Sequence, residues 1–183
     1  MTPERRVVCN RVLAYGTLAD MACAPRGPDR WLVLGLIAQE SQGEPYTWRY
    51  EPNFWSQRKG TIIRELTRTH PAWLPHGRLT AEDFDAACDR RAAVLAASYG
   101  LAQVMLITAV ELGVPLAYPT SLCEPATGIA AGVAYLRHCF DQVPKTETQP
   151  IRAALLAYNG GGDPTYDDKV LAWRDDCMET ARG

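Results

Sequence analysis

A run of apolar residues before position 40 constrains the fold of this chain more than any other feature. From Trp31 to Ala38 every residue is apolar or glycine, so a helix over this segment has an apolar surface on all sides and has to be buried. The run is far shorter than the roughly 20 apolar residues that span a bilayer. The sequence therefore predicts a central buried helix, which Asp29 caps at its start and which stops before Gly43.

Three polar residues, Gln39, Glu40 and Ser41, follow at the end of this predicted helix. A carboxyl group there is held on a rigid element, partly removed from water and beside the negative end of the helix dipole. Both effects disfavour the charged carboxylate and raise the pKa of Glu40. A carboxyl group that keeps its proton near neutral pH can act as a general acid. The alternative interpretation is that Glu40 only marks where the helix reaches solvent.

Length and charge limit the classes of protein to which the chain can belong. Its 183 residues suit a single domain over residues 1–183, and 47% hydrophobic with 22% charged residues is typical of a soluble globular protein. The formal net charge is −2 and no run of Lys and Arg is present, which argues against a nucleic-acid-binding protein. No segment is typical of a transmembrane helix, so we expect no membrane insertion.

The cysteines and histidines form no metal-binding pattern. The six cysteines are scattered, with no CxxC and no paired Cys/His spacing, so we expect no zinc site. The N-terminal segment lacks the apolar stretch and cleavage site of a secretory signal, so we expect synthesis in the cytoplasm. Without such a signal, reduced and mostly buried thiols are the default expectation.

Helical patterns dominate the rest of the chain. Capping, proline and glycine signals predict helices over 5–22, 62–66, 83–99, 101–113, 125–141, 150–159 and 166–178, with breaks at 24–28 and 69–78. Thr80 is a predicted N-cap, and Glu124 precedes Pro125 in the same way. Residues 44–57, with Pro45 and Pro52, indicate a fixed loop. The predicted fold class is mainly α with at most a small β element, for which weak signals lie within 46–80.

Four short segments occur in a characteristic order. They are Glu40-Ser41, Ser98-Tyr99-Gly100-Leu101-Ala102-Gln103, the segment from Glu124-Pro125 through Gly132 to Tyr135-Leu136, and Ala157-Tyr158-Asn159-Gly160-Gly161. Together they resemble the catalytic domain of soluble-type lytic transglycosylases (SLT), lysozyme-like enzymes that cleave peptidoglycan. The resemblance covers about residues 31–170, which leaves 1–30 as an N-terminal helical extension. The segments ASYGLAQVM and RYEPNFW also resemble phage-type members.

The chain departs from the family pattern at four positions. Ala102 stands where the family usually has Met, Leu106 where it has Pro, Glu124 where it has Asp, and Gly160 where it has Ala. Ala102 removes a side chain that would line the groove beside the acid, which affects the fit of the substrate more than the chemistry.

The resemblance implies a lysozyme-like fold and a mechanism with one carboxyl group. Glu40 would donate its proton to the glycosidic oxygen between MurNAc and GlcNAc. It would then take the proton of the MurNAc 6-hydroxyl, which closes onto C1 as a 1,6-anhydro product. The acetamido oxygen of the substrate would stabilise C1, unlike the two-carboxylate scheme of most glycosidases. No metal or organic cofactor is implied, the partner is a peptidoglycan glycan strand, and we expect a monomer.

Further residues of the four segments acquire substrate-binding roles from the resemblance. Ser41, Ser98 and Gln103 can hydrogen-bond near the acid or to the acetamido group, and Tyr158 can hold that group or the glutamate. Asn159 can fix the glycine-rich turn. Each also has a structural interpretation, as a surface residue, a core aromatic residue or a helix C-cap. Several aromatic residues can stack on sugar rings or pack in the core: Tyr46, Trp48, Tyr50, Phe54 and Trp55.

Glu51 separates the transglycosylase hypothesis from its nearest alternative. A hydrolytic muramidase on the same fold needs a second carboxylate to activate water, and Glu51 is the best-placed one. Otherwise Glu51 forms an ion pair with Arg49 or Arg58 and supports loop order or substrate binding. A third interpretation is a wall-binding lysozyme-like protein without activity. We expect the protein to act on the cell wall after lysis, within a virion, or after export by a non-standard route.

Overall fold

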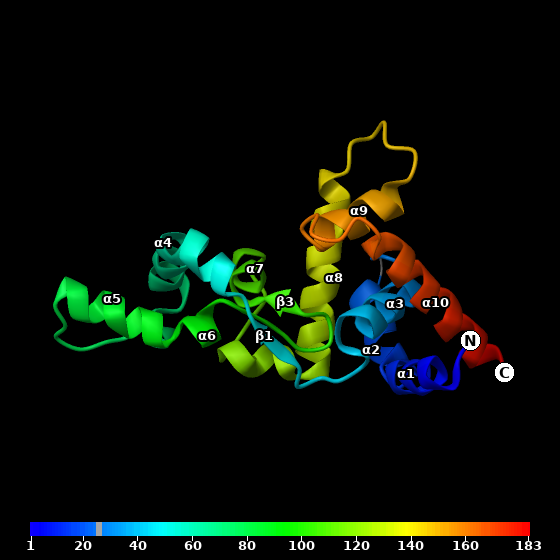
Figure 1. The fold of residues 1–183 in the computed structure, drawn as a ribbon, viewed down its shortest axis with the longest axis horizontal. Helices are drawn as coiled ribbons and strands as arrows, with labels where there is room; N and C mark the ends of the chain where they lie inside the picture. The colour runs from blue at the N-terminus through cyan, green and yellow to red at the C-terminus, as the bar shows by residue number, and fades with distance from the viewer. Residues whose placement is uncertain (25–26) are drawn as a thin grey trace.

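The chain folds mainly into α-helices, with one small sheet, in a computed structural model that describes residues 1–24 and 27–183 (Figure 1). The predicted break at 24–28 therefore lies partly outside the described residues. The helices are α1 (Pro3–Leu13), α2 (Gly16–Cys23), α3 (Arg30–Ser41), α4 (Pro52–Thr69), α5 (Ala81–Arg90), α6 (Ala92–Leu95), α7 (Leu106–Glu111), α8 (Pro125–Gln142), α9 (Pro150–Tyr158) and α10 (Tyr166–Arg182); the strands are β1 (Trp48–Tyr50), β2 (Ala97–Tyr99) and β3 (Val104–Met105); two 3-10 helices cover Pro71–Trp73 and Pro119–Cys123. The predicted fold class, mainly α with a small β element, is confirmed.

Helix α3 is buried on all sides, as its sequence predicts. Its residues from Leu32 to Ala38 are buried, and they are shared between two apolar clusters. Leu32 and Leu36 belong to the cluster formed with the sheet and with α4, α7 and α9. Val33, Leu34, Ile37 and Ala38 belong to the cluster formed with α1, α2 and α10. The helix thus joins the two halves of the core, and its C-terminal end is held rigidly between them.

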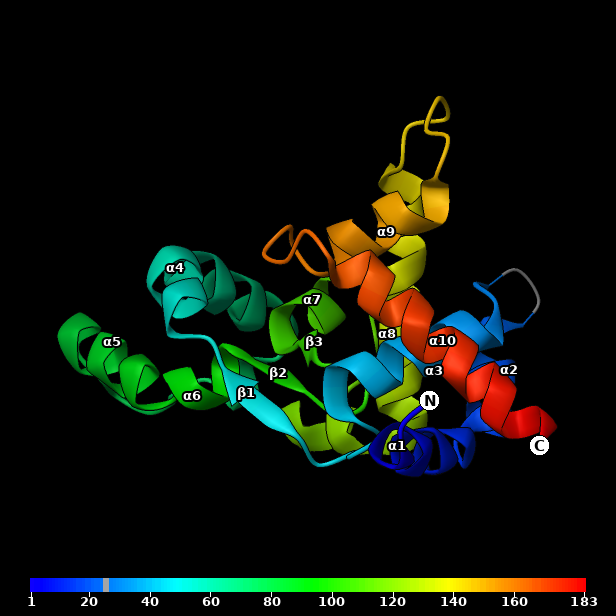
Figure 2. The same cartoon turned by 45° about the vertical axis from the view of Figure 1, so that its right-hand side comes forward.

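A glycine in α3 allows α10 to cross it at close range. A Cβ atom on Gly35 would lie 2.7 Å from the backbone oxygen of Val170 and 2.8 Å from the backbone nitrogen of Arg174. Any larger residue would therefore push the two helix backbones apart. In Figure 2, α10 passes in front of α3 and crosses it. This contact brings Tyr166 to the end of the helix that carries Glu40.

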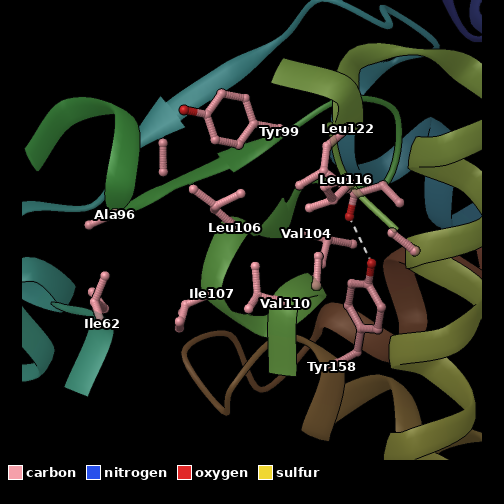
Figure 3. Close-up of a cluster of buried hydrophobic side chains, with 14 of the residues drawn as sticks. Ile62, Ala96, Tyr99, Val104, Leu106, Ile107, Val110, Leu116, Leu122 and Tyr158 are labelled. Atoms are coloured by element: carbon pink, nitrogen blue, oxygen red, sulfur yellow. Dashed lines mark hydrogen bonds between the residues drawn. The ribbon is translucent and has the colours of Figure 1, made fainter. Parts of the chain in front are cut away.

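The sheet has the order β1-β2-β3 with antiparallel neighbours. Trp48 pairs with Tyr99 and Arg49 pairs with Ser98. Because side chains alternate along a strand, these two pairs point to opposite faces of the sheet. Figure 3 shows apolar side chains from the end of the sheet and from α7 packed together beside Tyr158, including Val104, Leu106, Ile107 and Val110.

Two predicted helices are wrong where the sheet forms. The helix predicted over 83–99 is α5 and α6 followed by strand β2, and only Leu106–Glu111 of the segment 101–113 is helical. Residues 97–99 end an alanine-rich segment that favours helix locally, but all three are buried and paired with β1. The β2–β3 turn uses left-handed backbone at Gly100 (φ 74°) and Gln103 (φ 46°), which a continuous helix excludes.

Three further predictions near the N-terminal half need correction. The helix predicted over 5–22 is interrupted at Ala14 and Tyr15, giving α1 and α2. The loop predicted over 44–57 contains strand β1, and its second part is already helix α4. The helix predicted over 62–66 is confirmed as part of α4 but is longer than predicted. Proline at the first position of a helix is compatible with helix formation, so Pro52 begins α4 rather than breaking it.

Helices α8, α9 and α10 begin where proline, or the end of the glycine-rich turn, predicts them. Asp29 and Glu124 occupy the N-cap positions of α3 and α8, but neither side chain makes a capping hydrogen bond. The Thr80 hydroxyl does cap α5, accepting a hydrogen bond from the Asp83 backbone N–H at 3.1 Å. Among the described residues, no helix combines the length and apolar character that crossing a membrane requires.

Candidate active site

Glu40 lines a cavity of about 340 Å³ that lies between the end of α3 and the sheet. The side chain is half-buried. Strands, helices and the turn after α9 supply the rest of the wall, namely Arg49, Glu51, Phe54, Ser98, Gln103, Met105, Thr108, Tyr135, Tyr158, Asn159 and Gly160. The structure therefore brings together five of the six predicted partners of Glu40: Glu51, Ser98, Gln103, Tyr158 and Asn159.

Burial raises the pKa of the Glu40 carboxyl group, in the direction predicted from its place at the helix end. Two neighbours oppose this effect. The Tyr166 hydroxyl donates a hydrogen bond to Glu40 Oε1, and the positive charge of Arg49 favours the carboxylate. Burial is the largest of the three contributions, so the protonated carboxyl group is favoured relative to an exposed glutamate. This is the property that a general acid requires.

Tyr166 is the residue of this site that the sequence did not reveal. It is buried at the first position of α10 and lies 126 residues from Glu40 in the sequence. Arg152 of α9 forms ion pairs with Asp167 and Asp168, the two residues that follow Tyr166, and these pairs hold the start of α10 in place. The sequence marked Tyr166 only as the start of a helix, because its contact with Glu40 exists only once α10 crosses α3.

Tyr158 lines the cavity but does not bind Glu40. Its hydroxyl donates to the backbone oxygen of Ala102 at 2.7 Å, the dashed line in Figure 3. Its ring packs against Tyr135 with 4.7 Å between ring centroids. Burial raises the pKa of Tyr158 well above its ordinary value, so the hydroxyl stays neutral. Tyr158 therefore supports the wall of the cavity beside the Ala102 backbone.

Ser98 and Gln103 form a hydrogen-bonded pair at the sheet side of the cavity. The Ser98 hydroxyl donates to Gln103 Oε1 at 3.0 Å. Gln103 Nε2 donates to the backbone oxygens of Gly100 at 2.8 Å and Thr47 at 3.0 Å. These contacts fix the strained β2–β3 turn, and they orient both side chains toward the cavity that they line. Contact of either residue with a substrate stays a prediction.

Ser41 is buried and does not line the cavity. Its hydroxyl lies 2.9 Å from the backbone oxygen of Leu101 and 3.1 Å from that of Ile37, and it accepts a hydrogen bond from the Gly43 backbone N–H at 3.2 Å. The side chain thus ties the end of α3 to the turn that carries Gln103. The structure places it behind the site, where it supports Glu40 from the core.

Glu51 is paired with Arg49, one of the two partners that the sequence suggested. Arg49 Nε donates to Glu51 Oε1 at 2.5 Å, whereas Arg58 lies 3.9 Å from Glu111. Both Arg49 and Glu51 line the cavity, so a positive charge and a second carboxylate face the same space as Glu40. The ion pair agrees with the structural interpretation of Glu51, and a catalytic role of Glu51 is not tested by it.

Asn159 ends α9 and faces the glycine-rich turn that follows. With the side-chain amide oriented to satisfy its neighbours, Asn159 Oδ1 accepts hydrogen bonds from the backbone N–H of Asp163 at 2.7 Å and of Gly162 at 3.2 Å. This geometry fixes the turn, as the sequence predicted. The next residue, Gly160, has φ 68° and also lines the cavity.

A larger cavity, of about 550 Å³, lies on the opposite face of the sheet. Trp48 and Tyr99 line it together with Tyr46, whose side chain is largely exposed. Glu124, the one carboxyl group among the described residues of its wall, is exposed to solvent. We therefore assign acid chemistry to the smaller cavity, where burial raises the pKa of the half-buried Glu40 carboxyl group. Of the aromatic residues considered for sugar stacking, Phe54 alone lines that smaller cavity.

Over residues 1–24 and 27–183, no three His, Cys, Asp or Glu side chains gather into a group suited to a metal ion. The wall of the cavity carries the Glu40 carboxyl group, whose pKa is raised by burial and which accepts a hydrogen bond from Tyr166, and the guanidinium of Arg49.

Comparison with known families identifies the fold. The model of the transglycosylase SLT domain matches residues 18–170. The matched range contains all four sequence segments and begins within the predicted N-terminal extension. Comparison with curated proteins and with solved structures found no match. The match covers most of the chain and includes the helix, the sheet and the turns that surround Glu40. The chain therefore belongs to the transglycosylase SLT domain family, the soluble lytic transglycosylases of the lysozyme-like superfamily.

Proposed function

We propose that this protein is a lytic transglycosylase that cleaves the MurNAc–GlcNAc β-1,4 bond of peptidoglycan, with Glu40 as its single acid and base. At the level of the family, a transglycosylase-type function on peptidoglycan follows from the SLT domain. The observation that carries the finer proposal is the state of Glu40. It is the carboxyl group of the cavity whose pKa is raised by burial, and it accepts a hydrogen bond from Tyr166.

The proposed reaction moves two protons through Glu40, one from Glu40 to the leaving group and one from the substrate to Glu40. Protonated Glu40 donates to the glycosidic oxygen, so the bond from C1 to that oxygen breaks and GlcNAc leaves with a hydroxyl group. The MurNAc 6-hydroxyl then bonds to C1, and its proton returns to Glu40. No water enters the product, so the second carboxylate of a hydrolase is not required. Tyr166 holds the carboxyl group in place and stabilises its charged form between the two transfers.

Glu51 supports the alternative function, because it places a second carboxylate in the cavity. A muramidase would use this carboxylate to activate water. In the structure Glu51 accepts a hydrogen bond from Arg49, and this ion pair makes the Glu51 carboxylate a weaker base toward water. We therefore favour the transglycosylase.

Digestion of purified sacculi followed by mass spectrometry separates the two functions. A transglycosylase produces anhydro-muropeptides, which are lighter by one water than the reducing-end products of a muramidase. Glu40→Gln keeps the shape of the side chain but removes the proton, so we expect a loss of roughly 10²–10⁴ in rate with folding retained. As a matched control, Glu44→Gln changes an exposed glutamate outside the cavity and is expected to keep full activity.

Two results would reject the proposal. The first is a Glu40→Gln variant that keeps more than about a tenth of the wild-type rate, because acid catalysis contributes at least a hundredfold. The second is a wild-type digest composed mainly of reducing ends. The compartment in which the protein meets the wall, after lysis, in a virion or by another export route, belongs to the same proposal and is tested by locating the protein during growth.

A further inference from the structure

Two cysteines lie side by side in the core behind the catalytic helix. Cys9 on α1 and Cys177 on α10 are 168 residues apart in the sequence, and their Sγ atoms are 3.2 Å apart. Neither side chain has any exposed surface. The six cysteines are unpaired in the structure, and among them this is the one pair within hydrogen-bonding distance.

The surrounding contacts hold the first and last helices in register around this pair. Arg5 forms an ion pair with Asp176, the neighbour of Cys177, and its guanidinium lies 3.6 Å from the centre of the Trp173 ring. At the ends of the helices, the Thr180 hydroxyl lies 3.5 Å from Met1 Sδ. The folded chain therefore brings the two thiols together before any covalent bond forms.

We propose that Cys9 and Cys177 are a disulfide-forming pair, which closes by thiol–disulfide exchange with an external disulfide once the protein leaves a reducing compartment. The thiolate of one cysteine attacks a sulfur of the external disulfide and releases a thiolate. The second cysteine then loses its proton and attacks the mixed disulfide, releasing the other thiolate. The two cysteines are oxidised and the external disulfide is reduced to two thiolates, which take up the two cysteine protons through solvent and become thiols.

Burial governs when this exchange takes place. It raises the pKa of the Cys177 thiol, and the contact with Cys9 acts in the same direction, so in the folded protein the Cys177 thiol stays protonated and unreactive. Attack therefore requires that α1 or the end of α10 opens, or that the chain is still folding. Terminal segments open more easily than central ones, so the pair can be oxidised without global unfolding.

The consequence of the bond is a covalent link between the ends of the chain. It closes a loop that includes almost every residue, and the stabilisation by a cross-link grows with the length of the loop that it closes. The link also fixes α10, the helix whose first residue donates to Glu40. The disulfide would therefore stabilise the site in the oxidising environment outside the cell. Its formation does not depend on whether Glu40 is catalytic.

The test is oxidative refolding of the reduced, unfolded chain with a glutathione redox buffer, followed by alkylation and non-reducing peptide mass spectrometry. We expect a cross-linked peptide that contains Cys9 and Cys177, with the other four of the six cysteines alkylated. The melting temperature is expected to rise by roughly 5–15 °C relative to the reduced protein. Cys9→Ala abolishes this rise, whereas Cys139→Ala, another buried thiol, retains it.

Three outcomes would overturn the proposal: six alkylated cysteines after oxidative refolding, a cross-link at another pair, or a Cys9→Ala variant that still melts higher after oxidation. Each is independent of transglycosylase activity, which the sacculus digest measures separately. If Cys9→Ala folds poorly, Cys177→Ser provides the second variant, and the mass of the cross-linked peptide from the wild type decides the assignment without any variant.

Discussion

Substitution of Tyr166 by phenylalanine tests the electrostatics of the proposed acid directly. The change removes one buried hydroxyl, which donates to Glu40 Oε1, and leaves the ring in its place at the start of α10. A hydrogen bond to the charged carboxylate lowers the pKa of Glu40, against the effect of burial. Tyr166→Phe is therefore expected to raise that pKa further.

The size of the effect follows from the energy of one charge-assisted hydrogen bond. Such a bond contributes about 1.5–3 kcal/mol. Because one pKa unit corresponds to about 1.4 kcal/mol, the pKa of Glu40 is expected to rise by about 1–2 units. The proposed first step needs protonated Glu40, so activity falls as pH rises through this pKa. In Tyr166→Phe the alkaline limb of the kcat/KM profile on sacculi should move to higher pH by the same amount.

Tyr158→Phe is the matched control for this experiment. It also removes a buried hydroxyl from the wall of the cavity, but that hydroxyl donates to the Ala102 backbone and not to Glu40. Its cost is the loss of a partner for a buried carbonyl, about 1–3 kcal/mol of stability, with the alkaline limb unchanged. An alkaline limb that stays fixed or moves to lower pH in Tyr166→Phe would refute the reasoning, as would equal movement in Tyr158→Phe.

Three further predictions concern charge, reaction type and backbone strain. The folded-state pKa of Glu40 is raised, so wild-type stability falls as pH rises from the ordinary glutamate pKa through the raised one. Glu40→Gln lacks this loss of stability. The difference between its melting temperature and that of the wild type should therefore increase from pH 4 to pH 7, and a difference that stays constant would show that Glu40 ionises normally. Glu51→Gln should still produce anhydro-muropeptides in a sacculus digest, and loss of all activity together with reducing ends in the wild-type digest would indicate hydrolysis. Gly100→Ala should destabilise the fold by about 2–5 kcal/mol in urea denaturation, because φ is 74° and the added Cβ would lie 2.0 Å from the Leu122 backbone oxygen. Gly160→Ala has positive φ but nothing within 4 Å, so it should cost only about 1–2 kcal/mol; equal costs at the two positions would contradict the packing argument.

The sequence analysis identified the buried helix α3 and the carboxyl group at its end because both are local properties. An apolar surface on every side of a short helix requires burial, wherever the partners come from. A glutamate at the end of such a helix is half-buried, and the direction of its pKa follows from that burial alone. The helices that begin at Pro125 and Pro150 were predicted for a similar reason, since proline at a helix start acts within one turn.

Predictions failed where distant residues decide the local conformation. Residues 97–99 end an alanine-rich segment that favours helix, but pairing with β1, some fifty positions away, makes them a strand. Ser41, predicted beside the substrate, is instead drawn into the core by its hydrogen bond to Leu101. For Tyr158 the sequence left three interpretations open, a contact with the acetamido group, a contact with the glutamate and a core aromatic residue, and only the fold shows that its hydroxyl donates to the Ala102 backbone.

The contact between Tyr166 and Glu40 shows most clearly what depends on tertiary structure. The carboxyl group, the buried helix under it and the order of the four segments can be read from the chain, since each depends on residues a few positions apart. The hydroxyl that steadies the carboxyl group comes from 126 residues away. It arrives because Gly35 lets α10 cross α3 at backbone contact, and because Arg152 anchors the start of α10. A close crossing of two helices depends on the side chains of both helices at the contact, so the sequence of either helix alone does not predict it.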